Sequence, residues 1–303
     1  MTAAVRPGPI VVIGSHVAGL LLEVDAVPRE GESVLGRGFA EPEDGGKATN
    51  QAVAAAKLGA PVRLITLLGD DERGDRWNGI LAGYGMDTTF VMRHPGPTDV
   101  GFVLLPPSGI PAIAVSIELS VALEAALLER ASSALEDASL VLCQLEAPQG
   151  CALAAFRLAR SAGARTLLNP APAAQLAPEL LSLTDVLIPN EHEAAVLAGR
   201  AGTPAELAEL LCERRDGGAV IVTAGGDGCY VAAGGRCDHL PAREVTAIDT
   251  TGGGDAFIGA LAVRLREGDA LLDAATFAIR AAALSVTRPG TMPAYATATD
   301  LLP

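Results

Sequence analysis

Residues 249–257 read Asp-Thr-Thr-Gly-Gly-Gly-Asp-Ala-Phe, and the apolar run that follows, 257–265, is typical of a buried helix. The first N–H groups of such a helix have no intrahelical partner and carry the positive end of its dipole. An anion can therefore bind there, and glycines allow it to approach the backbone amides. The carboxylate of Asp255 would repel a phosphate group, which favours a chemical role for this residue. The residues alone fit a second interpretation equally well, in which Asp255 caps the helix and the glycines form a tight turn.

A second glycine-rich loop, Gly45-Gly46-Lys47-Ala48-Thr49-Asn50, lies about two hundred residues earlier and also precedes an alanine-rich helix. Its lysine and asparagine offer a cation and a carboxamide to a hydroxylated ligand, and its glycines leave the backbone accessible. In isolation, this segment also fits an ordinary loop with a solvated lysine.

Together, the two loops resemble the two signature sequences of the PfkB carbohydrate kinases, and of the ribokinase branch in particular. Shorter segments continue the resemblance in the order expected for the family, at 11–15, 69–74, 144–146, 169–172, 189–193, 223–228 and 287–290. The resemblance covers nearly the whole chain. It implies a single PfkB-type kinase domain, residues 1–303, with a ribokinase-like three-layer α/β/α sandwich, a mostly parallel central sheet and a small β-sheet lid.

The hydrophobic pattern agrees with this fold class. Short apolar runs alternate with Ala/Leu-rich helical stretches, which predicts a parallel sheet with helices on both faces; the runs are 10–13, 63–67, 140–142, 165–168, 186–188 and 219–222. Two strand-like segments, 20–39 and 100–116, interrupt the alternation, with a hairpin turn expected at 106–109. The resemblance implies that inserted segments at about 17–44 and 98–117 form the lid, whose outer face often makes a dimer. Ordinary surface hairpins are the alternative.

Charge and cysteine content limit the partners. The formal net charge is −14, and basic residues do not cluster, so we expect no nucleic-acid partner. Five cysteines without a C-x-x-C pair suggest reduced thiols in the cytoplasm. No signal-peptide core precedes the first strand, and no apolar segment approaches the roughly twenty residues that span a bilayer.

The resemblance assigns a chemical role to each loop. Asp255 is expected to be the general base that accepts the proton of a sugar hydroxyl, and the backbone amides of Gly252, Gly253 and Gly254 are expected to form an anion hole for the transferred phosphoryl group.

The resemblance also implies sites for nucleotide and cations. Asn190 and Glu193 would organise Mg²⁺ through water; a helix cap at Asn190 with a solvated Glu193 is the alternative. The expected nucleotide-binding residues are Asn190, Thr223, Gly225, Gly226, Asp227, Gly228, Gly254 and Ile279. A monovalent cation, expected to be K⁺, would be held largely by backbone carbonyls of Asp249, Thr251, Ser285, Arg288, Gly290 and Ala294.

The expected sugar site keeps part of the ribokinase pattern and loses another part. Its residues are Gly45, Gly46, Lys47, Asn50, Glu146, Asp255, Val17 and Gly19. Ribokinases carry Gly-Ser-x-Asn-x-Asp after the first strand, and their Asp binds two vicinal sugar hydroxyls. Here Val17 and Gly19 replace the Asn and the Asp. Either the substrate differs at those hydroxyls or another residue takes over; His16 is a candidate, although a structural role for it is favoured.

These observations predict an ATP-dependent sugar kinase that phosphorylates a primary hydroxyl of a pentose or a related small sugar, with ATP, Mg²⁺ and K⁺ as cofactors and a homodimer formed through the lid. A nucleoside kinase of the same fold is one alternative, although Phe39 and Phe102 are the only aromatic residues that the lid offers to a base. A catalytically idle sugar-sensing module is the other, and the retained Asp255 argues against it.

Overall fold

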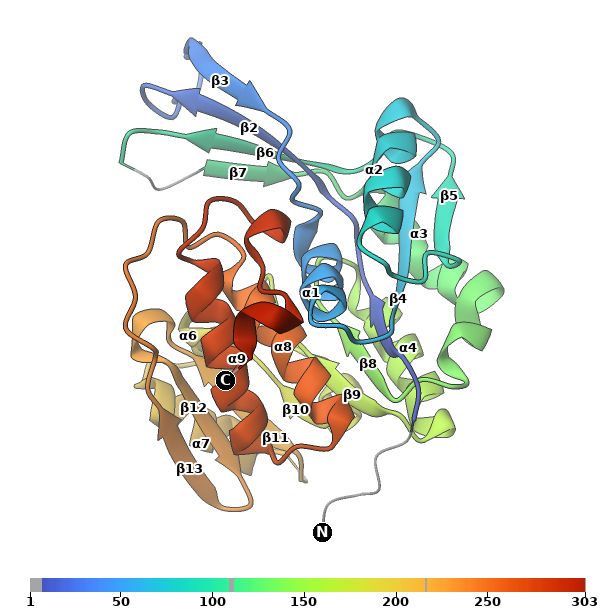
Figure 1. The fold of residues 1–303 in the computed structure, drawn as a ribbon, viewed down its shortest axis with the longest axis vertical. Coiled ribbons are helices and arrows are strands. Elements are labelled where there is room, and N and C mark those ends of the chain that lie inside the picture. The colour runs from blue at the N-terminus through green and yellow to red at the C-terminus, as the bar shows by residue number, and fades with distance from the viewer. Residues whose placement is uncertain (1–6, 109–111, 216, 303) are drawn as a thin grey trace.

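A computed structural model describes residues 7–108, 112–215 and 217–302 (Figure 1). In this part of the chain, nine strands form a large sheet in the order β13-β12-β11-β10-β9-β8-β1-β4-β5. The parallel strands are β1 (Ile10–Ile13), β4 (Val62–Gly69), β5 (Val91–His94), β8 (Leu140–Cys143), β9 (Arg165–Leu168), β10 (Val186–Leu187) and β11 (Ala219–Thr223). Two antiparallel strands, β12 (Cys229–Ala233) and β13 (Arg236–Leu240), complete one edge.

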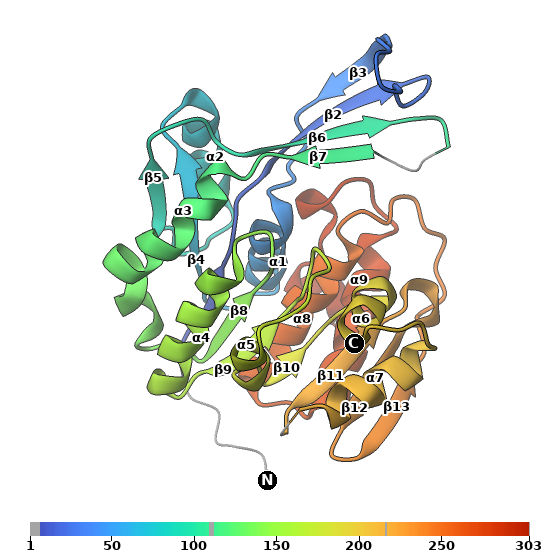
Figure 2. The same ribbon diagram turned by 180° about the vertical axis from the view of Figure 1, so that it is seen from behind.

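Helices cover both faces of this sheet, as Figures 1 and 2 show from opposite sides. One face carries α1 (Gly46–Lys57), α2 (Glu72–Gly83), α8 (Gly253–Glu267) and α9 (Leu271–Ser285). The other carries α3 (Glu118–Ala126), α4 (Gln149–Ala162), α5 (Pro178–Ser182), α6 (Glu191–Ala198) and α7 (Pro204–Glu213). Short turns of helix lie at Leu127–Ala131, Ser132–Leu135, Gly225–Asp227, Met292–Ala294 and Ala298–Leu301. The predicted three-layer α/β class is therefore confirmed.

The central strands are apolar throughout because both of their faces are buried. In β1, Ile10 and Val12 pack into the core beneath α1 and α8, whereas Val11 and Ile13 pack into the core beneath α3 and α4. Side chains alternate between the faces of a strand, so a continuous apolar run supplies both layers.

A close approach of α1 to α8 brings the two glycine-rich loops together. Gly259 lies at the crossing: a Cβ atom there would be 2.6 Å from the Ala54 Cβ and 2.7 Å from the Gln51 carbonyl oxygen. Such distances are far below normal contacts between carbon atoms. The absence of a side chain at this position thus allows the two helices to pack backbone to backbone.

The second sheet stands apart from the body, above α1 in Figure 1. It has the order β3-β2-β6-β7, formed by β2 (Ala18–Val24), β3 (Gly36–Ala40), β6 (Val100–Leu105) and β7 (Ala112–Val115). Strands β2 and β6 are parallel, and the other two pairs are antiparallel. Gly109 of the hairpin turn expected at 106–109 lies outside the described residues.

The remaining sequence expectations concern cysteines and membranes. All five cysteines are free, and Cys143, Cys151 and Cys229 are buried. Across the described ranges, we find no helix with the length and apolar character needed to cross a bilayer.

Candidate active site

Asp255 lies in the first turn of α8 and does not cap that helix. Gly252 is the N-cap residue, in the left-handed conformation with φ 73°, and α8 begins at Gly253. The carboxylate of Asp255 accepts hydrogen bonds from Gln51 Nε2 at 2.9 Å and from Asn50 Nδ2 at 3.3 Å. The interpretation of Asp255 as a helix cap is therefore wrong, because its carboxylate oxygens accept hydrogen bonds from side chains of α1 and not from backbone amides of α8.

The glycines before Asp255 leave backbone amides open. A Cβ atom at Gly252 would lie 2.6 Å from the Tyr295 hydroxyl, so both its positive φ and its surroundings require glycine. The Gly253 amide donates to the Thr250 carbonyl at 3.2 Å. The amides of Gly252 and Gly254 find no acceptor among the described residues, and a Cβ atom at Gly254 would meet open space. Two of the three expected anion-hole amides are thus available to a ligand.

A chain of buried amide side chains fixes Gln51, and sequence reasoning did not identify it. Gln144 Nε2 donates to Gln51 Oε1 at 2.5 Å, and Gln51 Nε2 donates to Asn169 Oδ1 at 3.1 Å as well as to Asp255. Asn169 Nδ2 donates in turn to the Ile188 carbonyl at 2.9 Å. Buried polar groups need partners, so this network holds the Gln51 amide in one orientation. The sequence offered one signal, a glutamine among the alanines of residues 48–56, and the structure shows that this glutamine is fully buried.

The expected sugar-binding residues gather at the start of α1. The Lys47 amide donates to Glu146 Oε2 at 2.9 Å, and the Gly45 amide donates to Asn50 Oδ1 at 3.1 Å. Asn50 Nδ2 donates to Asp44 Oδ1 at 2.8 Å in addition to Asp255. The structure thus joins the α1 loop, Glu146 in the segment that follows β8, and the start of α8 in one polar cluster.

Burial and charge shift the pKa values of this cluster. Burial raises the pKa of Glu146 to about 7, against the opposing effect of the Lys47 charge and amide. Burial likewise raises the pKa of Asp255, although Lys47 and the two amide donors oppose the shift. Burial alone would lower the pKa of Lys47, but the surrounding carboxylates, Asp255 foremost, raise it overall. Lys47 therefore carries a positive charge that several carboxylates share.

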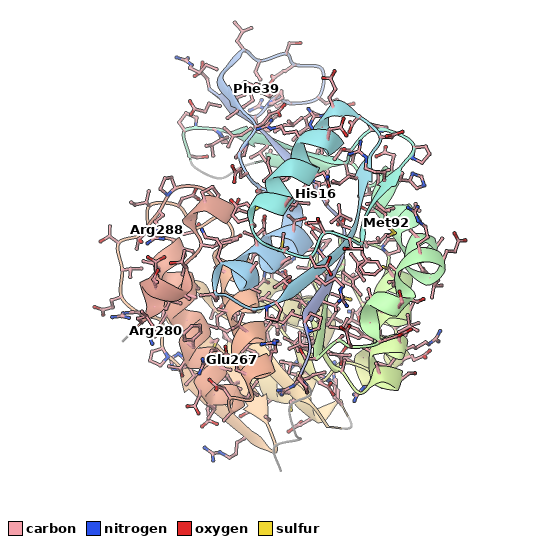
Figure 3. The ribbon with its side chains drawn as sticks, turned by 45° about the vertical axis from the view of Figure 1, so that its right-hand side comes forward. His16, Phe39, Met92, Glu267, Arg280 and Arg288 are labelled. Carbon is pink, nitrogen blue, oxygen red and sulfur yellow. The ribbon has the colours of Figure 1, made fainter. Side chains whose placement is uncertain are left out.

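Val17, Gly19 and His16 follow β1 and differ in their surroundings. Val17 is buried, and a Cβ atom at Gly46 would lie 3.1 Å from its Cβ. A Cβ atom at Gly19 would lie 3.3 Å from the Cβ of Asp44. His16 lies inside the body beside α2, whereas Phe39 marks the small sheet above (Figure 3).

His16 takes the structural role. Its Nδ1 is 3.0 Å from Thr49 Oγ1, and its ring meets Trp77 edge to face with centroids 4.4 Å apart. Burial lowers its pKa to about 3, so the imidazole is neutral at physiological pH. The side chain is 1% exposed, which favours the structural role over the alternative in which His16 replaces the missing sugar-binding carboxylate.

Asn190 and Glu193 form a capping box at the start of α6. Asn190 Oδ1 accepts from the Glu193 amide at 2.8 Å, while the Glu193 carboxylate accepts from the Asn190 amide at 2.8 Å and from its side-chain nitrogen at 2.9 Å. The helix cap at Asn190 from the alternative interpretation is therefore confirmed, but its solvated Glu193 is wrong, because Glu193 is 6% exposed. Burial raises its pKa, and both Lys47 and Asp255 influence it, so this end of the site adjoins the cluster around α1.

Most of the remaining nucleotide-binding candidates lie at the carboxyl end of β11. Thr223 pairs with Asn190, and its amide donates to the Pro189 carbonyl at 3.0 Å. Gly225, Gly226 and Asp227 form an exposed helical turn after β11, and the Asp227 carboxylate accepts from the Tyr230 hydroxyl at 2.7 Å. Ile279 lies on α9, half-buried against the core under that helix. The structure thus puts Ile279 on a different layer from the β11 turn.

Two loops near the start of α8 carry four of the expected cation ligands, whereas Ser285 ends α9 and Ala294 ends a short helical turn. The Asp249 carboxylate ties the two loops together, accepting from the Thr251 amide and the Gly290 amide, each at 2.9 Å. The Ser285 carbonyl accepts from the Arg288 amide at 3.1 Å. Within the described ranges, no hydrogen-bond donor reaches the backbone carbonyls of Asp249, Thr251, Arg288, Gly290 and Ala294.

Comparison with known proteins gives a consistent result. The sequence profile of the pfkB family carbohydrate kinases matches residues 9–298. A ribokinase from Mus musculus is 32% identical over 304 residues, which covers 96% of this chain and 93% of that protein. A deoxyribokinase from Salmonella typhi is 33% identical over 291 residues, covering 94% and 95%. The solved structure of Arabidopsis thaliana ribokinase with ribose and ATP superposes with a TM-score of 0.87 at 26% identity, covering 97% of each chain.

Proposed function

Because the chain belongs to the pfkB family of carbohydrate kinases, we propose that the cluster around Asp255 transfers the γ-phosphoryl group of ATP to a primary hydroxyl of a pentose or a related small sugar. The chain is an ATP-dependent, ribokinase-like sugar kinase. One observation carries the finer proposal: the Asp255 carboxylate is held by two side-chain amides beside the open backbone amides at the start of α8.

Asp255 acts as the general base. As the sugar oxygen bonds to the γ-phosphorus, the hydroxyl proton passes to a carboxylate oxygen of Asp255, the bond from the γ-phosphorus to the β,γ-bridging oxygen breaks, and ADP leaves. Phosphoryl transfer depends mostly on positioning and charge stabilisation, and a positioned base contributes roughly 10²–10⁴-fold. The raised pKa of Asp255 makes it a better proton acceptor than an ordinary aspartate. The open amides of Gly252 and Gly254 stabilise the charge that develops on the transferred group.

The nucleotide lies along the β11 turn and Ile279, with its phosphates toward Asn190 and Glu193. Magnesium supplies neutralisation of the phosphate charge when bound. Both Glu193 oxygens already accept hydrogen bonds from Asn190, which favours contact through water over direct coordination. Each carboxylate oxygen retains a second lone pair with which it can accept a proton of such a water.

A monovalent cation, K⁺, binds between the loops at 249–251 and 288–290. Backbone carbonyls without a donor support this proposal, because oxygen atoms that lack a partner are suitable cation ligands. The Asp249 carboxylate holds the two loops in place, and a cation there adds positive charge beside the start of α8.

The small sheet serves as the lid, formed by segments at about 17–44 and 98–117 of a single kinase domain, 1–303. A homodimer forms through it. Phe39 is 65% exposed and Phe102 is 52% exposed on this sheet, which supports a surface that becomes covered. Five free cysteines and the likeness to ribokinases support a place in the cytoplasm.

The test is an ADP-release screen with magnesium-ATP and potassium against pentoses, deoxypentoses, hexoses, polyols and nucleosides, run beside Asp255→Asn. Activity on a sugar that disappears in the variant supports the proposal. Activity confined to nucleosides favours the nucleoside kinase. Sugar binding without ADP release in any reaction favours the sensing module.

A further inference from the structure

We infer that Asp44 supplies the sugar-binding carboxylate that position 19 lacks, and that it does so through a single open oxygen, Oδ2. The inference rests on the proposed sugar kinase activity and specifies how its acceptor is recognised. Asp44 is not one of the residues that the resemblance to ribokinases assigns to the sugar.

Gly19 and Asp44 lie side by side in the structure. The Gly19 amide donates to the Asp44 carbonyl at 3.0 Å. A Cβ atom built on Gly19 would lie 3.3 Å from the Asp44 Cβ and 3.4 Å from the Pro42 Cγ. A carboxylate that starts from residue 44 can therefore reach the region that a side chain at residue 19 would enter.

The Asp44 side chain turns toward the reacting end of the site. Its Oδ1 accepts from Asn50 Nδ2 at 2.8 Å and from the Gly46 amide at 3.2 Å. The same Asn50 nitrogen reaches Asp255 Oδ2 at 3.3 Å, so one NH₂ group bridges the two carboxylates. Asp44 also influences the pKa values of Lys47, Glu146 and Asp255, which places its charge among theirs.

The second carboxylate oxygen of Asp44, Oδ2, is open to a ligand. Asp44 is only half-buried, and none of the described residues donates a hydrogen bond to its Oδ2. A sugar hydroxyl is the natural donor for this atom in an occupied site. Oδ1 already accepts two hydrogen bonds, so Asp44 cannot bind a vicinal pair of hydroxyls with one carboxylate oxygen for each. We infer that its Oδ2 binds a single hydroxyl.

Glu43 provides a matched control because its side chain points elsewhere. Its carboxylate accepts from the Tyr84 hydroxyl at 2.5 Å, and its carbonyl accepts from Thr291 Oγ1 at 2.7 Å. It is the neighbour of Asp44 in sequence, carries the same charge and does not contact the cluster around Asp255.

The inference predicts an unequal response to the loss of each sugar hydroxyl. In the wild-type enzyme, one of the two deoxy analogues, 2-deoxyribose or 3-deoxyribose, keeps kcat/KM within about tenfold of ribose, since it keeps the hydroxyl that donates to the Asp44 carboxylate. The other loses more than about tenfold, because a hydrogen bond to a charged group contributes more. A carboxylate that grips both hydroxyls would instead penalise both analogues alike.

The experiment compares steady-state kinetics of the full-length wild type, Asp44→Asn and Glu43→Gln on ribose and both deoxy analogues. Asp44→Asn keeps an oxygen for Asn50 and the Gly46 amide, so its fold is retained, and circular dichroism checks this. We expect Asp44→Asn to raise the KM for ribose at least about tenfold with little change in kcat or in the KM for ATP, and to remove the difference between the analogues. Glu43→Gln should match the wild type.

A relocation variant gives an independent outcome. Gly19→Asp alone should not improve ribose use, because it sets a second carboxylate against Asp44. The double variant Gly19→Asp/Asp44→Ala should recover at least about tenfold in kcat/KM over Asp44→Ala alone. An active wild type whose ribose KM is unchanged in Asp44→Asn, or a double variant without recovery, overturns the inference. A wild type with no Asp255-dependent transfer to any sugar instead overturns the proposed function on which the inference rests.

Discussion

Gln51 Nε2 donates a 2.9 Å hydrogen bond to Asp255 Oδ1 across 204 positions of sequence. This bond connects the two glycine-rich loops, because Gln51 belongs to the helix that follows the first loop and Asp255 to the helix that follows the second. A general base must be oriented as well as basic, and an amide fixed by its own partners supplies that orientation.

Replacing the proposed base should abolish phosphoryl transfer. We expect Asp255→Asn to lower kcat by roughly 10²–10⁴-fold while ATP binding, measured by calorimetry, stays close to that of the wild type. Asp273→Asn, in the exposed first turn of α9, is the control for removing one aspartate. An Asp255→Asn enzyme with more than a tenth of wild-type turnover would show that another residue is the base.

Removing the orienting amide should affect the pH dependence of the reaction. The hydrogen bond from Gln51 lowers the pKa of Asp255, so Gln51→Leu should raise that pKa further and move the acid limb of the kcat profile to higher pH. At neutral pH we expect kcat to fall about ten- to a hundredfold. Gln149→Leu is the control, because it removes a half-buried amide whose hydrogen bonds go to residues 175 and 177 and not to Asp255. If the acid limb of the kcat profile stayed at the same pH in Gln51→Leu, Gln51 would have only a packing role.

Glu146 should make the protein less stable as the pH rises. Its pKa is about 7 in the folded state against an ordinary value of 4.5, so folding favours the protonated carboxyl group. Its contribution to stability therefore decreases between pH 4.5 and about 7, by on the order of 3 kcal/mol in total. In urea unfolding at pH 8, Glu146→Gln should be more stable than the wild type by up to this amount, and the two should converge near pH 5. Glu213→Gln, at an exposed position of α7, is the control for removing one glutamate.

Potassium should accelerate the reaction. We expect at least about fivefold higher activity in potassium chloride than in the chloride of a large organic cation at equal ionic strength. The comparison is repeated with Asp249→Asn, which weakens the tie between the two loops and should reduce the difference. Equal rates in both salts would exclude a functional monovalent cation.

The proposed dimer should depend on the apolar surface of the lid. Phe102 pairs with Ala114 across β6 and β7, and Ile113 pairs with Val103, so Phe102 and Ile113 lie on opposite faces of this sheet. A Cβ atom at Gly101 would lie 3.3 Å from the Val17 Cγ1, so this face of β6 is turned toward the site. Phe102 is the next residue of the strand, and its side chain therefore lies on the outward face. Phe102→Asp should yield a monomer in sedimentation velocity at concentrations where the wild type is a dimer. Val121→Asp, at an exposed position of α3, is the control, and a monomeric wild type would contradict the proposal.

The sequence predicted the family and the layered fold because each depends on local signals. Buried parallel strands are short apolar runs, and glycine-rich turns before apolar helices are recognisable without coordinates. The side-chain network could not be predicted in the same way. Gln51 meets Asp255 only because α1 crosses α8 closely, and a spacing along one chain does not define such a crossing.

Two side chains illustrate the same difficulty at shorter range. A glutamate in the first turn of a helix is normally solvated, yet Glu193 is buried at the start of α6, and Asn190 fixes its carboxylate. His16 follows the end of β1 near the proposed sugar site, but its ring is buried in the core, where it contacts Trp77 and Thr49. In each case, the tertiary partner decides the role.

The crossing at Gly259 implies that the separation between two helices is itself a determinant of activity. A methyl group at residue 259 would push α1 away from α8. The hydrogen bond from the Gln51 amide to the Asp255 carboxylate would then be lost. A relative could keep every signature residue intact and still lose catalysis by gaining one carbon atom in its interior. In this chain, the bare helix crossing is therefore as much a part of the catalytic apparatus as the two glycine-rich loops that it brings together.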